Sequence, residues 1–187
     1  EMIEEVSEYT VGASLGVNEE YIENARMYLE AGADFLCVDI AHGGLELCVD
    51  TVSDLSQEFP NVDIMAGNVV TTQTAKNLIE AGANSIKVGV GPGSTCETRV
   101  VTGVGVPQFT AVKNVAEGLQ DIENDVTIVA DGGIRTSGDM VKALAAGADT
   151  VMVGSFVGGC VESPGEIIEL EGEYYHQIRG MASSEAR

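Results

Sequence analysis

The residues best suited to chemistry lie between positions 87 and 108, in the stretch KVGVGPGSTCETRVVTGVGVPQ. A short apolar strand runs into a glycine-rich turn, and a single cysteine, Cys96, follows that turn. Gly89, Gly91 and Gly93 permit close backbone approach and positive φ angles, so the turn predicts a cradle for an anion. A free cysteine is most often a buried small hydrophobe, but backbone N–H dipoles in a polar loop favour the thiolate that a nucleophile requires. We therefore take Cys96 as the candidate nucleophile.

Three groups of glycine and serine residues could bind a phosphate through backbone N–H groups, which suits a chain with few basic residues near them. The groups are Gly91, Gly93 and Ser94, then Gly132 and Gly133, then Gly154 and Ser155, which precede an expected helix of small residues, FVGGC. Each group alone could be only a tight turn between a strand and a helix. Because all three follow strands of one predicted barrel, we expect them to converge on a phosphate.

Two aspartates end apolar strands, and each could hold a ribose. Asp131 ends the strand in TIVADGG, and Asp39 ends the strand in FLCVDIAHGG. A carboxylate at such a position can accept two hydrogen bonds from a ribose diol, or it can cap the turn that follows. His42, beside Asp39, fits a catalytic group and a surface or supporting group equally well.

A repeat predicts the elements that position these residues. The segments LEAGAD, IEAGAN and LAAGAD, at 29–34, 79–84 and 144–149, are each followed by an apolar strand, FLCVD, SIKVG or TVMVG. In each copy the glycine fits the position after a helix end, and the next residues fit a buried parallel strand. Further strands are expected at 10–16, 62–68 and 127–133, and helices at about 19–30, 45–58, 72–80, 110–119 and 137–145.

Six short strands that alternate with helices predict a parallel α/β protein, and repetition in two-strand units favours a (β/α)₈ TIM barrel over a doubly wound sheet. Residues 1–187 are expected to form one catalytic domain with about six βα units. Such barrels carry their chemistry at the carboxyl ends of the strands, where the candidate residues fall. Residues 165–180 predict a β-hairpin that turns at Glu171 and Gly172 above the barrel mouth.

The composition excludes several kinds of partner. Among 187 residues, 30 are acidic and 9 basic, which gives a formal net charge of −21 spread along the chain. This charge disfavours nucleic acid and anionic membranes, and no apolar run approaches the roughly 18 residues of a membrane span. The four cysteines form no CxxC pair, which indicates reduced thiols in a cytoplasmic protein. Cys37 and Cys48 are expected to be buried, and Cys160 to be structural and helical.

Several long motifs resemble the catalytic barrel of the IMP dehydrogenase and GMP reductase family. The motifs are GVGPGSTCETR, TGVGVPQ, ADGGIRTSGDMVKALAAGAD, VMVGS, ESPGE and RGMAS, and the similarity runs from about Val11 to Ala186. The resemblance implies a (β/α)₈ barrel, of which this chain would carry strands 3 to 8. It also implies a homotetramer whose substrate is a purine nucleoside monophosphate.

The resemblance also implies a role for each matching residue. Cys96 would attack C2 of the purine ring, and Thr98 would relay protons. Substrate contacts are implied for Ser94, Asp131, Gly132, Gly133, Gly154, Ser155, Gly180 and Met181, with the ribose at Asp131 and the base at the last two. NAD, or NADP in the alternative, would contact Asp39, Ile40, Ala41, Gly89 and Gly91. A potassium ion would bind the main-chain carbonyls of Gly91, Gly93 and Cys96.

Within the family, the motifs favour IMP dehydrogenase, which oxidises IMP to XMP with NAD through a covalent thioimidate, here on Cys96. GMP reductases have a glutamate where this chain has Ser184, whereas Glu185, one position later, fits the dehydrogenase pattern. The alternative is GMP reductase, which converts GMP to IMP with NADPH and releases ammonia. A second alternative, from another class, is a nucleotide-binding fragment without catalysis.

Three features depart from the family pattern. Glu97 places a negative charge beside Cys96, which opposes thiolate formation. Ile178 stands where dehydrogenases have a phosphate-binding tyrosine. The first two barrel strands and the mobile flap that activates water find no match in residues 1–187, so we expect an open barrel that other parts of the protein complete.

Overall fold

The computed structural model describes residues 3, 6, 8–122, 125–163 and 165–176. Its main feature is a sheet of six parallel strands that stand side by side in chain order. The strands are β1 (Gly12–Leu15), β2 (Phe35–Asp39), β3 (Asp63–Val69), β4 (Ser85–Val88), β5 (Thr127–Asp131) and β6 (Thr150–Met152). A doubly wound sheet would reverse direction at a switch point, whereas sequential order is that of a barrel. The prediction of a TIM-barrel fold is confirmed.

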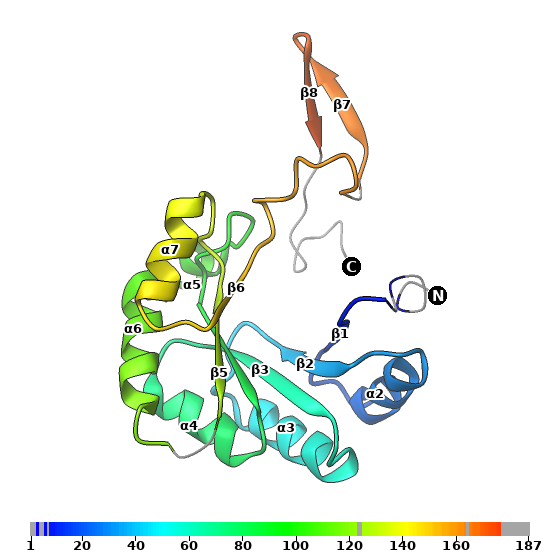
Figure 1. Cartoon of the computed structure of the whole chain (residues 1–187), viewed down its shortest axis with the longest axis vertical. Helices are drawn as coiled ribbons and strands as arrows, with labels where there is room; N and C mark the ends of the chain where they lie inside the picture. The colour runs from blue at the N-terminus through cyan, green and yellow to red at the C-terminus, as the bar shows by residue number, and fades with distance from the viewer. Residues whose placement is uncertain (1–2, 4–5, 7, 123–124, 164, 177–187) are drawn as a thin grey trace.

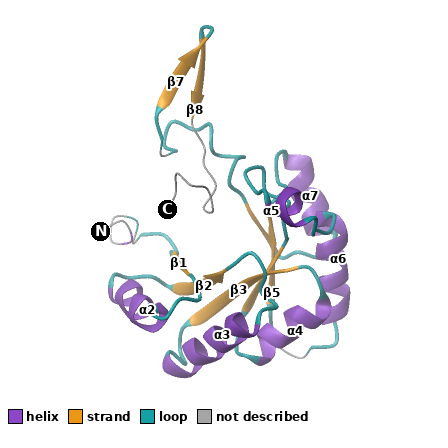
Figure 2. Ribbon diagram, turned by 180° about the vertical axis from the view of Figure 1, so that it is seen from behind, coloured by secondary structure: helices purple, strands orange, loops and turns teal. Residues whose placement is uncertain are grey.

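The sheet curls into a half-barrel with helices on its outer face (Figure 1). Among the described residues β1 and β6 are its open edges, in agreement with the expectation that six strands do not close. The helices are α2 (Tyr21–Glu30), α3 (Glu46–Glu58), α4 (Thr72–Glu80), α6 (Gln108–Leu119) and α7 (Ser137–Ala145). A short helix, α5 (Thr98–Thr102), lies in the loop after β4 (Figure 2).

Side chains alternate between the two faces of the sheet, because successive side chains of a strand point in opposite directions. Leu36, Val38, Ile86, Val88 and their neighbours at equivalent positions are buried against the helices and form the core. Asp39, Lys87 and Asp131 lie at the alternate positions of their strands, so their side chains share the inner, concave face of the half-barrel. The hydrophobic core and the candidate site therefore lie on opposite faces of the sheet.

The repeated helix ends have the predicted geometry. Gly32, Gly82 and Gly147 follow the last residues of their helices with φ angles of 100°, 114° and 107°. Glycine adopts this left-handed conformation without the steric cost that a side chain would add. Each glycine turns the chain into the next strand.

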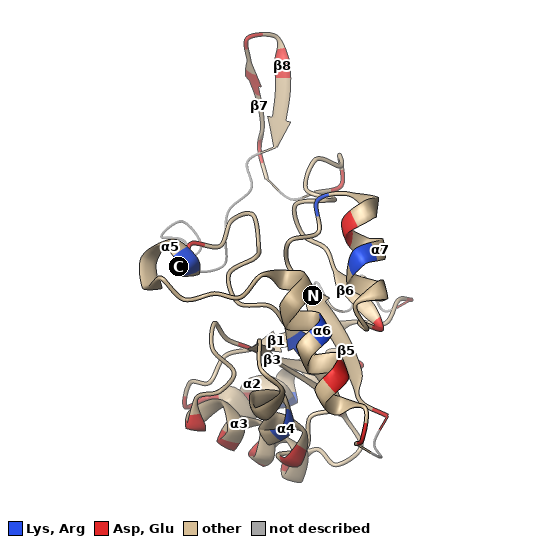
Figure 3. Ribbon diagram, turned by 90° about the vertical axis from the view of Figure 1, so that its left-hand side faces the viewer, with Lys and Arg blue, Asp and Glu red and all other residues tan. Residues whose placement is uncertain are grey.

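The expected hairpin is also present. Strand β7 (Ile167–Leu170) pairs with β8 (Glu173–His176), and Glu171 and Gly172 form the turn between them. The hairpin extends away from the curled sheet (Figure 1). Acidic side chains lie on this hairpin and on the outer helices (Figure 3), so the negative charge is distributed as expected.

Two sequence-based expectations about helices were wrong. The segment FVGGC forms turns rather than a helix, and Cys160 within it is exposed rather than structural. Its two adjacent glycines each disfavour a helix by roughly 1 kcal/mol relative to alanine. The sequence analysis also missed α5, which is short and contains two β-branched valines. No helix in the described part of the chain is long and apolar enough to cross a membrane.

Candidate functional site

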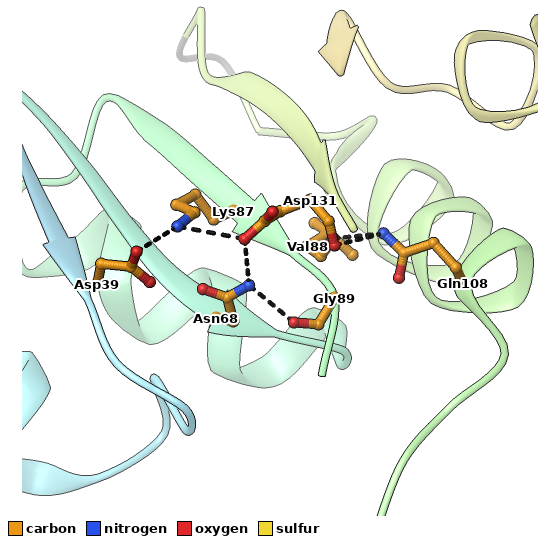
Figure 4. Close-up of polar contacts among 7 residues, drawn as sticks. All are labelled: Asp39, Asn68, Lys87, Val88, Gly89, Gln108 and Asp131. Atoms are coloured by element: carbon orange, nitrogen blue, oxygen red, sulfur yellow. Dashed lines mark hydrogen bonds and ion pairs between the residues drawn. The ribbon is translucent and has the colours of Figure 1, made fainter. Parts of the chain in front are cut away.

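A buried lysine joins two carboxylates at the carboxyl ends of the strands (Figure 4). Lys87 Nζ, on β4, lies 2.8 Å from Asp39 Oδ2 on β2 and 3.2 Å from Asp131 Oδ2 on β5. The lysine side chain is only 2% exposed, whereas Asp39 and Asp131 are 39% and 22% exposed. A charge is almost never buried so completely without ionic partners. The two carboxylates therefore account for the buried ammonium and remain accessible to a ligand.

The charges of this cluster are set by its surroundings. Burial alone would lower the pKa of Lys87, but the nearby carboxylates of Asp131 and Asp39 outweigh it and raise that pKa above its ordinary value. Cys37 lies on the same face, and burial raises the pKa of its thiol to about 11. At neutral pH Lys87 is thus charged and Cys37 is a neutral thiol.

Two amide side chains brace the cluster. Asn68, in β3, donates from Nδ2 to Asp131 Oδ2 at 2.7 Å and to the carbonyl of Gly89 at 2.8 Å. Gln108, at the start of α6, donates from Nε2 to the carbonyls of Val88 and Asp131, at 2.7 and 3.2 Å. Their oxygens, Asn68 Oδ1 and Gln108 Oε1, are buried and find no hydrogen-bond donor among the described residues. Buried acceptors of this kind fit a ligand that brings hydroxyl or amide donors.

The candidate nucleophile lies on the loop after β4. Cys96 is exposed, and its Sγ donates to Thr98 Oγ1 across 3.2 Å. Thr98 is the first residue of α5, so the short helix fixes the hydroxyl next to the thiol. The proximity of these two side chains is what a relay of the thiol proton requires.

Arg99 holds the ends of this loop together. Its Nε donates to the carbonyl of Val90 at 3.1 Å, and its Nη2 donates to the carbonyl of Val106 at 2.5 Å. The side chain passes between Gly91 and Gly105, where an added Cβ would lie 2.5 Å from arginine atoms. Glycine at both positions thus makes room for the guanidinium.

The loop also packs directly on the end of β5. A Cβ on Gly132 would lie 2.8 Å from Pro92 Cγ and 2.9 Å from Gly93 N, and one on Gly89 would lie 2.1 Å from the carbonyl oxygen of Asp131. Gly132 and Gly89 have φ angles of 90° and 148°, which favour glycine as well. The first two phosphate-binding groups predicted from the sequence are therefore neighbours.

The third predicted group lies on the adjacent strand. Met152 of β6 pairs with Asp131 of β5, so Gly154 and Gly133, each two residues further on, leave the sheet at the same level. The turns at 155–160 replace the helix expected there, so no helix N-terminus adds its dipole to Gly154 and Ser155. Any anion contact at this group would use the backbone of the turn alone.

The remaining predicted residues divide into two sets. Ile40 and Ala41 follow Asp39, and Ile40 is tied to β3 because its N–H donates to the carbonyl of Gly67 at 3.0 Å. His42 Nδ1 accepts from the N–H of Gly44 at 3.0 Å, so its ring stabilises a turn. The second set lies outside the described residues and comprises Ile178, Gly180, Met181, Ser184 and Glu185.

Sequence reasoning gave no role to four residues of the site: Lys87, Asn68, Gln108 and Arg99. One signal was available, because Lys87 interrupts the apolar strand SIKV, and a cation in a buried parallel strand requires an ionic partner. No comparable signal marks the two amides or Arg99, whose partners are backbone carbonyls distant in sequence.

A metal ion would have to use the backbone. Within the described ranges no group of three or more His, Cys, Asp or Glu side chains could hold one. The carbonyls of Gly91, Gly93 and Cys96 lie in one loop, and the carbonyl of Gly93 accepts the N–H of Cys96 at 3.1 Å. A carbonyl oxygen keeps a second lone pair, so this contact is compatible with a potassium ion.

Comparison with known proteins gives one consistent picture. The sequence model of the IMP dehydrogenase / GMP reductase domain matches residues 1–187. The chain is 50% identical to the inosine-5′-monophosphate dehydrogenase of Aquifex aeolicus over 96% of its own length and 36% of that protein. It is 49% identical to the GMP reductase of Leishmania major over 92% of its own length and 35% of that protein.

A solved structure extends this likeness to three dimensions. The GMP reductase of Trypanosoma brucei, a cysteine-to-alanine variant in complex with guanosine 5′-monophosphate, superimposes with a TM-score of 0.90 and 46% sequence identity. The superposition covers 95% of this chain and 37% of that one. The chain thus spans little more than a third of the length of these relatives.

Proposed function

Because the chain belongs to the IMP dehydrogenase and GMP reductase family, we propose that it forms the catalytic site of an IMP dehydrogenase, which oxidises IMP to XMP with NAD⁺. The observation that carries the covalent chemistry is the pair formed by Cys96 Sγ and Thr98 Oγ1, 3.2 Å apart on a loop that packs on the end of β5. The choice of dehydrogenase over reductase rests on the sequence motifs, among them Ser184 followed by Glu185. A thiol held beside a hydroxyl, on a loop that packs against the strand ending in Asp131, suits covalent attack on a nucleotide base.

The nucleotide would be held by three kinds of contact. Asp131 accepts hydrogen bonds from the ribose hydroxyls, and backbone N–H groups near Gly133, Gly154 and Ser155 receive the 5′-phosphate, together with Ser94. Asp39 meets the ribose of the dinucleotide, and Asn68 Oδ1, which finds no donor in the described part of the chain, adds an acceptor on the same side. The purine is thereby directed at the Cys96 loop.

The covalent step uses groups of this chain. The Cys96 thiol gives its proton to Thr98 Oγ1, which passes a proton on to solvent, and the sulfur bonds to C2 of the purine. Bound NAD⁺ supplies the acceptor for the hydride that C2 loses. The resulting thioimidate on Cys96 is released when water adds to C2, which returns the thiol and yields XMP.

GMP reductase is the second candidate, favoured by the likeness to the Leishmania major and Trypanosoma brucei enzymes. In that reaction the same thiol attacks C2 of GMP, ammonia leaves, and C2 accepts a hydride from NADPH. The Cys96 and Thr98 pair serves both reactions equally, so the choice depends on the second half of the chemistry.

One set of assays decides between these functions. In the full chain we expect IMP with NAD⁺ to produce NADH, and Cys96→Ala to abolish turnover while nucleotide binding is retained. Cys160→Ala, at an exposed cysteine far along the chain, is the matched control and should remain active. If the chain oxidises NADPH in the presence of GMP but does not turn over IMP with NAD⁺, it is a GMP reductase and not a dehydrogenase. Binding of IMP with no turnover of either substrate, and no burst of NADH, would indicate a nucleotide-binding protein instead.

A further inference from the structure

We propose that Lys87 is a positioning residue that holds Asp131 and Asp39 in one fixed arrangement and thereby sets the preference of the site for ribose over 2′-deoxyribose. The inference rests on the proposed function for the class of ligand. It adds a residue to which neither the sequence analysis nor the covalent mechanism gives a task.

The first argument is the geometry of the ammonium group. Lys87 Nζ reaches 2.8 Å from Asp39 Oδ2 and 3.2 Å from Asp131 Oδ2, although β3 and β4 lie between β2 and β5 in strand order. Figure 4 shows the lysine between the two carboxylates, with Asn68 below them. No other cation contacts either carboxylate within the described ranges. One side chain therefore links groups from strands that never touch each other.

The second argument is orientation. Asp131 Oδ2 accepts from Lys87 Nζ and also from Asn68 Nδ2 at 2.7 Å, and Asp39 Oδ2 accepts from Lys87. Among the described residues Oδ1 of each carboxylate accepts no side-chain hydrogen bond, so each carboxylate keeps one oxygen available to a ligand. A carboxylate whose other oxygen is held by a buried donor cannot rotate freely, and such preorganisation favours a ligand that presents two hydroxyls in a set geometry.

The third argument is that Gly67 lets β3 approach β4 closely at the base of the Lys87 side chain. A Cβ on Gly67 of β3 would lie 2.6 Å from Lys87 Cβ and 2.7 Å from its carbonyl oxygen. The lysine stem therefore packs against the bare glycine backbone of the neighbouring strand. The only other titratable group facing the cluster in the described chain is the neutral thiol of Cys37, so the balance of charge depends on Lys87.

A purely structural lysine predicts a different outcome. Removal of one partner from a buried ion pair destabilises a fold, and general loosening of the site would weaken the binding of all nucleotides by a similar factor. A carboxylate that is no longer held in place would instead weaken the binding of IMP, which has the 2′-hydroxyl, and leave the binding of 2′-deoxy-IMP nearly unchanged. The ratio of two dissociation constants separates the two cases, whereas a melting temperature does not.

The test compares IMP with 2′-deoxy-IMP by calorimetric titration of the full chain. We expect the wild type to bind the deoxynucleotide roughly 10- to 100-fold more weakly, the range for a hydrogen bond to a charged group. Lys87→Met should reduce this ratio to about threefold or less, whereas Lys87→Arg, which keeps the positive charge and N–H donors, should retain most of it. Lys113→Met, at a lysine that is 52% exposed, should leave the ratio unchanged.

Each result has a distinct meaning. A ratio that survives in Lys87→Met overturns the inference and leaves the proposed function intact. A wild type that binds neither nucleotide overturns the proposed function and the inference together. If Lys87→Met does not fold, Lys87→Leu, which likewise has neither donor nor charge, provides the same measurement, and a wild-type ratio in that variant overturns the inference as well.

Discussion

Replacement of Arg99 by methionine should loosen the loop that carries the candidate nucleophile. Methionine retains the aliphatic stem that packs between Gly91 and Gly105, but it removes the donors to the carbonyls of Val90 and Val106. These two carbonyls lie at the two ends of the loop. Loss of both hydrogen bonds therefore frees the loop ends from each other and does not only remove a single local contact. Cys96 lies inside the bracketed segment.

The size of the effect follows from the contacts. A hydrogen bond from a charged donor contributes roughly 1.5–3 kcal/mol, and because Arg99 is only half-buried the lower value applies to each of its two bonds. The total is about 3 kcal/mol, which corresponds to roughly a 100-fold change in the equilibrium for opening the loop. A displacement of Cys96 of about 1 Å would reduce turnover by a similar factor of roughly 100.

Hydrogen exchange measured by mass spectrometry tests this reasoning directly. Amides at 90–106 should exchange roughly 100-fold faster in Arg99→Met than in the wild type, while those of β2 keep their rates. Arg135→Met removes an exposed arginine and is the matched control. If exchange at 90–106 in Arg99→Met stays within about threefold of the wild type, Arg99 does not hold the loop.

Three further predictions concern other parts of the molecule. Gly67→Ala would bring a methyl group against Lys87 and should reduce the free energy of unfolding by roughly 1–3 kcal/mol in a urea titration. Gly16→Ala, where an added Cβ meets nothing within 4 Å, should change it by less than about 0.5 kcal/mol. Equal effects of the two variants would contradict the packing argument. Asp139 accepts from Lys142 and from the cap of α7, which lowers its pKa, so Asp139→Asn should lower the melting temperature at pH 7. That difference should shrink as the pH falls below about 4, because stability from a depressed carboxyl pKa is lost on protonation, and a constant difference down to pH 3 would refute it. Burial raises the pKa of both Cys37 and Cys48 to about 11, so at pH 8 iodoacetamide should label the two exposed cysteines at least about 100-fold faster, and uniform labelling in peptide maps would be the contrary result.

The elements that could be predicted from the sequence are those whose ends carry a local signal. Strand β2 and helices α4 and α7 have the bounds that the repeat indicated, because a glycine after each helix forces the turn and an apolar run follows. The segment FVGGC has no such signal at its ends. Its apolar residues suggested a helix, but its two glycines disfavour the helical backbone, and the segment forms a series of turns.

The site was predictable only in part, because its parts come from different strands. Asp39 and Asp131 could be singled out because each ends an apolar strand, which is a local pattern, and the structure places both beside Lys87. Their connection through Lys87 depends on the curl of the sheet and on strand order, neither of which any short segment encodes. Arg99 was missed for the same reason, because it binds backbone carbonyls, which every residue possesses.

The charges of the site also bear on how it can orient a nucleotide. Lys87 carries one positive charge and Asp39 and Asp131 two negative ones, so the cluster is net negative by one, in a chain whose formal net charge is −21. Such a cluster repels a phosphate but accepts hydroxyl donors, which favours a ribose over a phosphate at Asp131. For the nucleotide proposed above, we therefore expect the phosphate at the backbone N–H groups beyond Gly133 and toward β6. In that orientation the ribose would lie at Asp131 and the base would face the loop of Cys96.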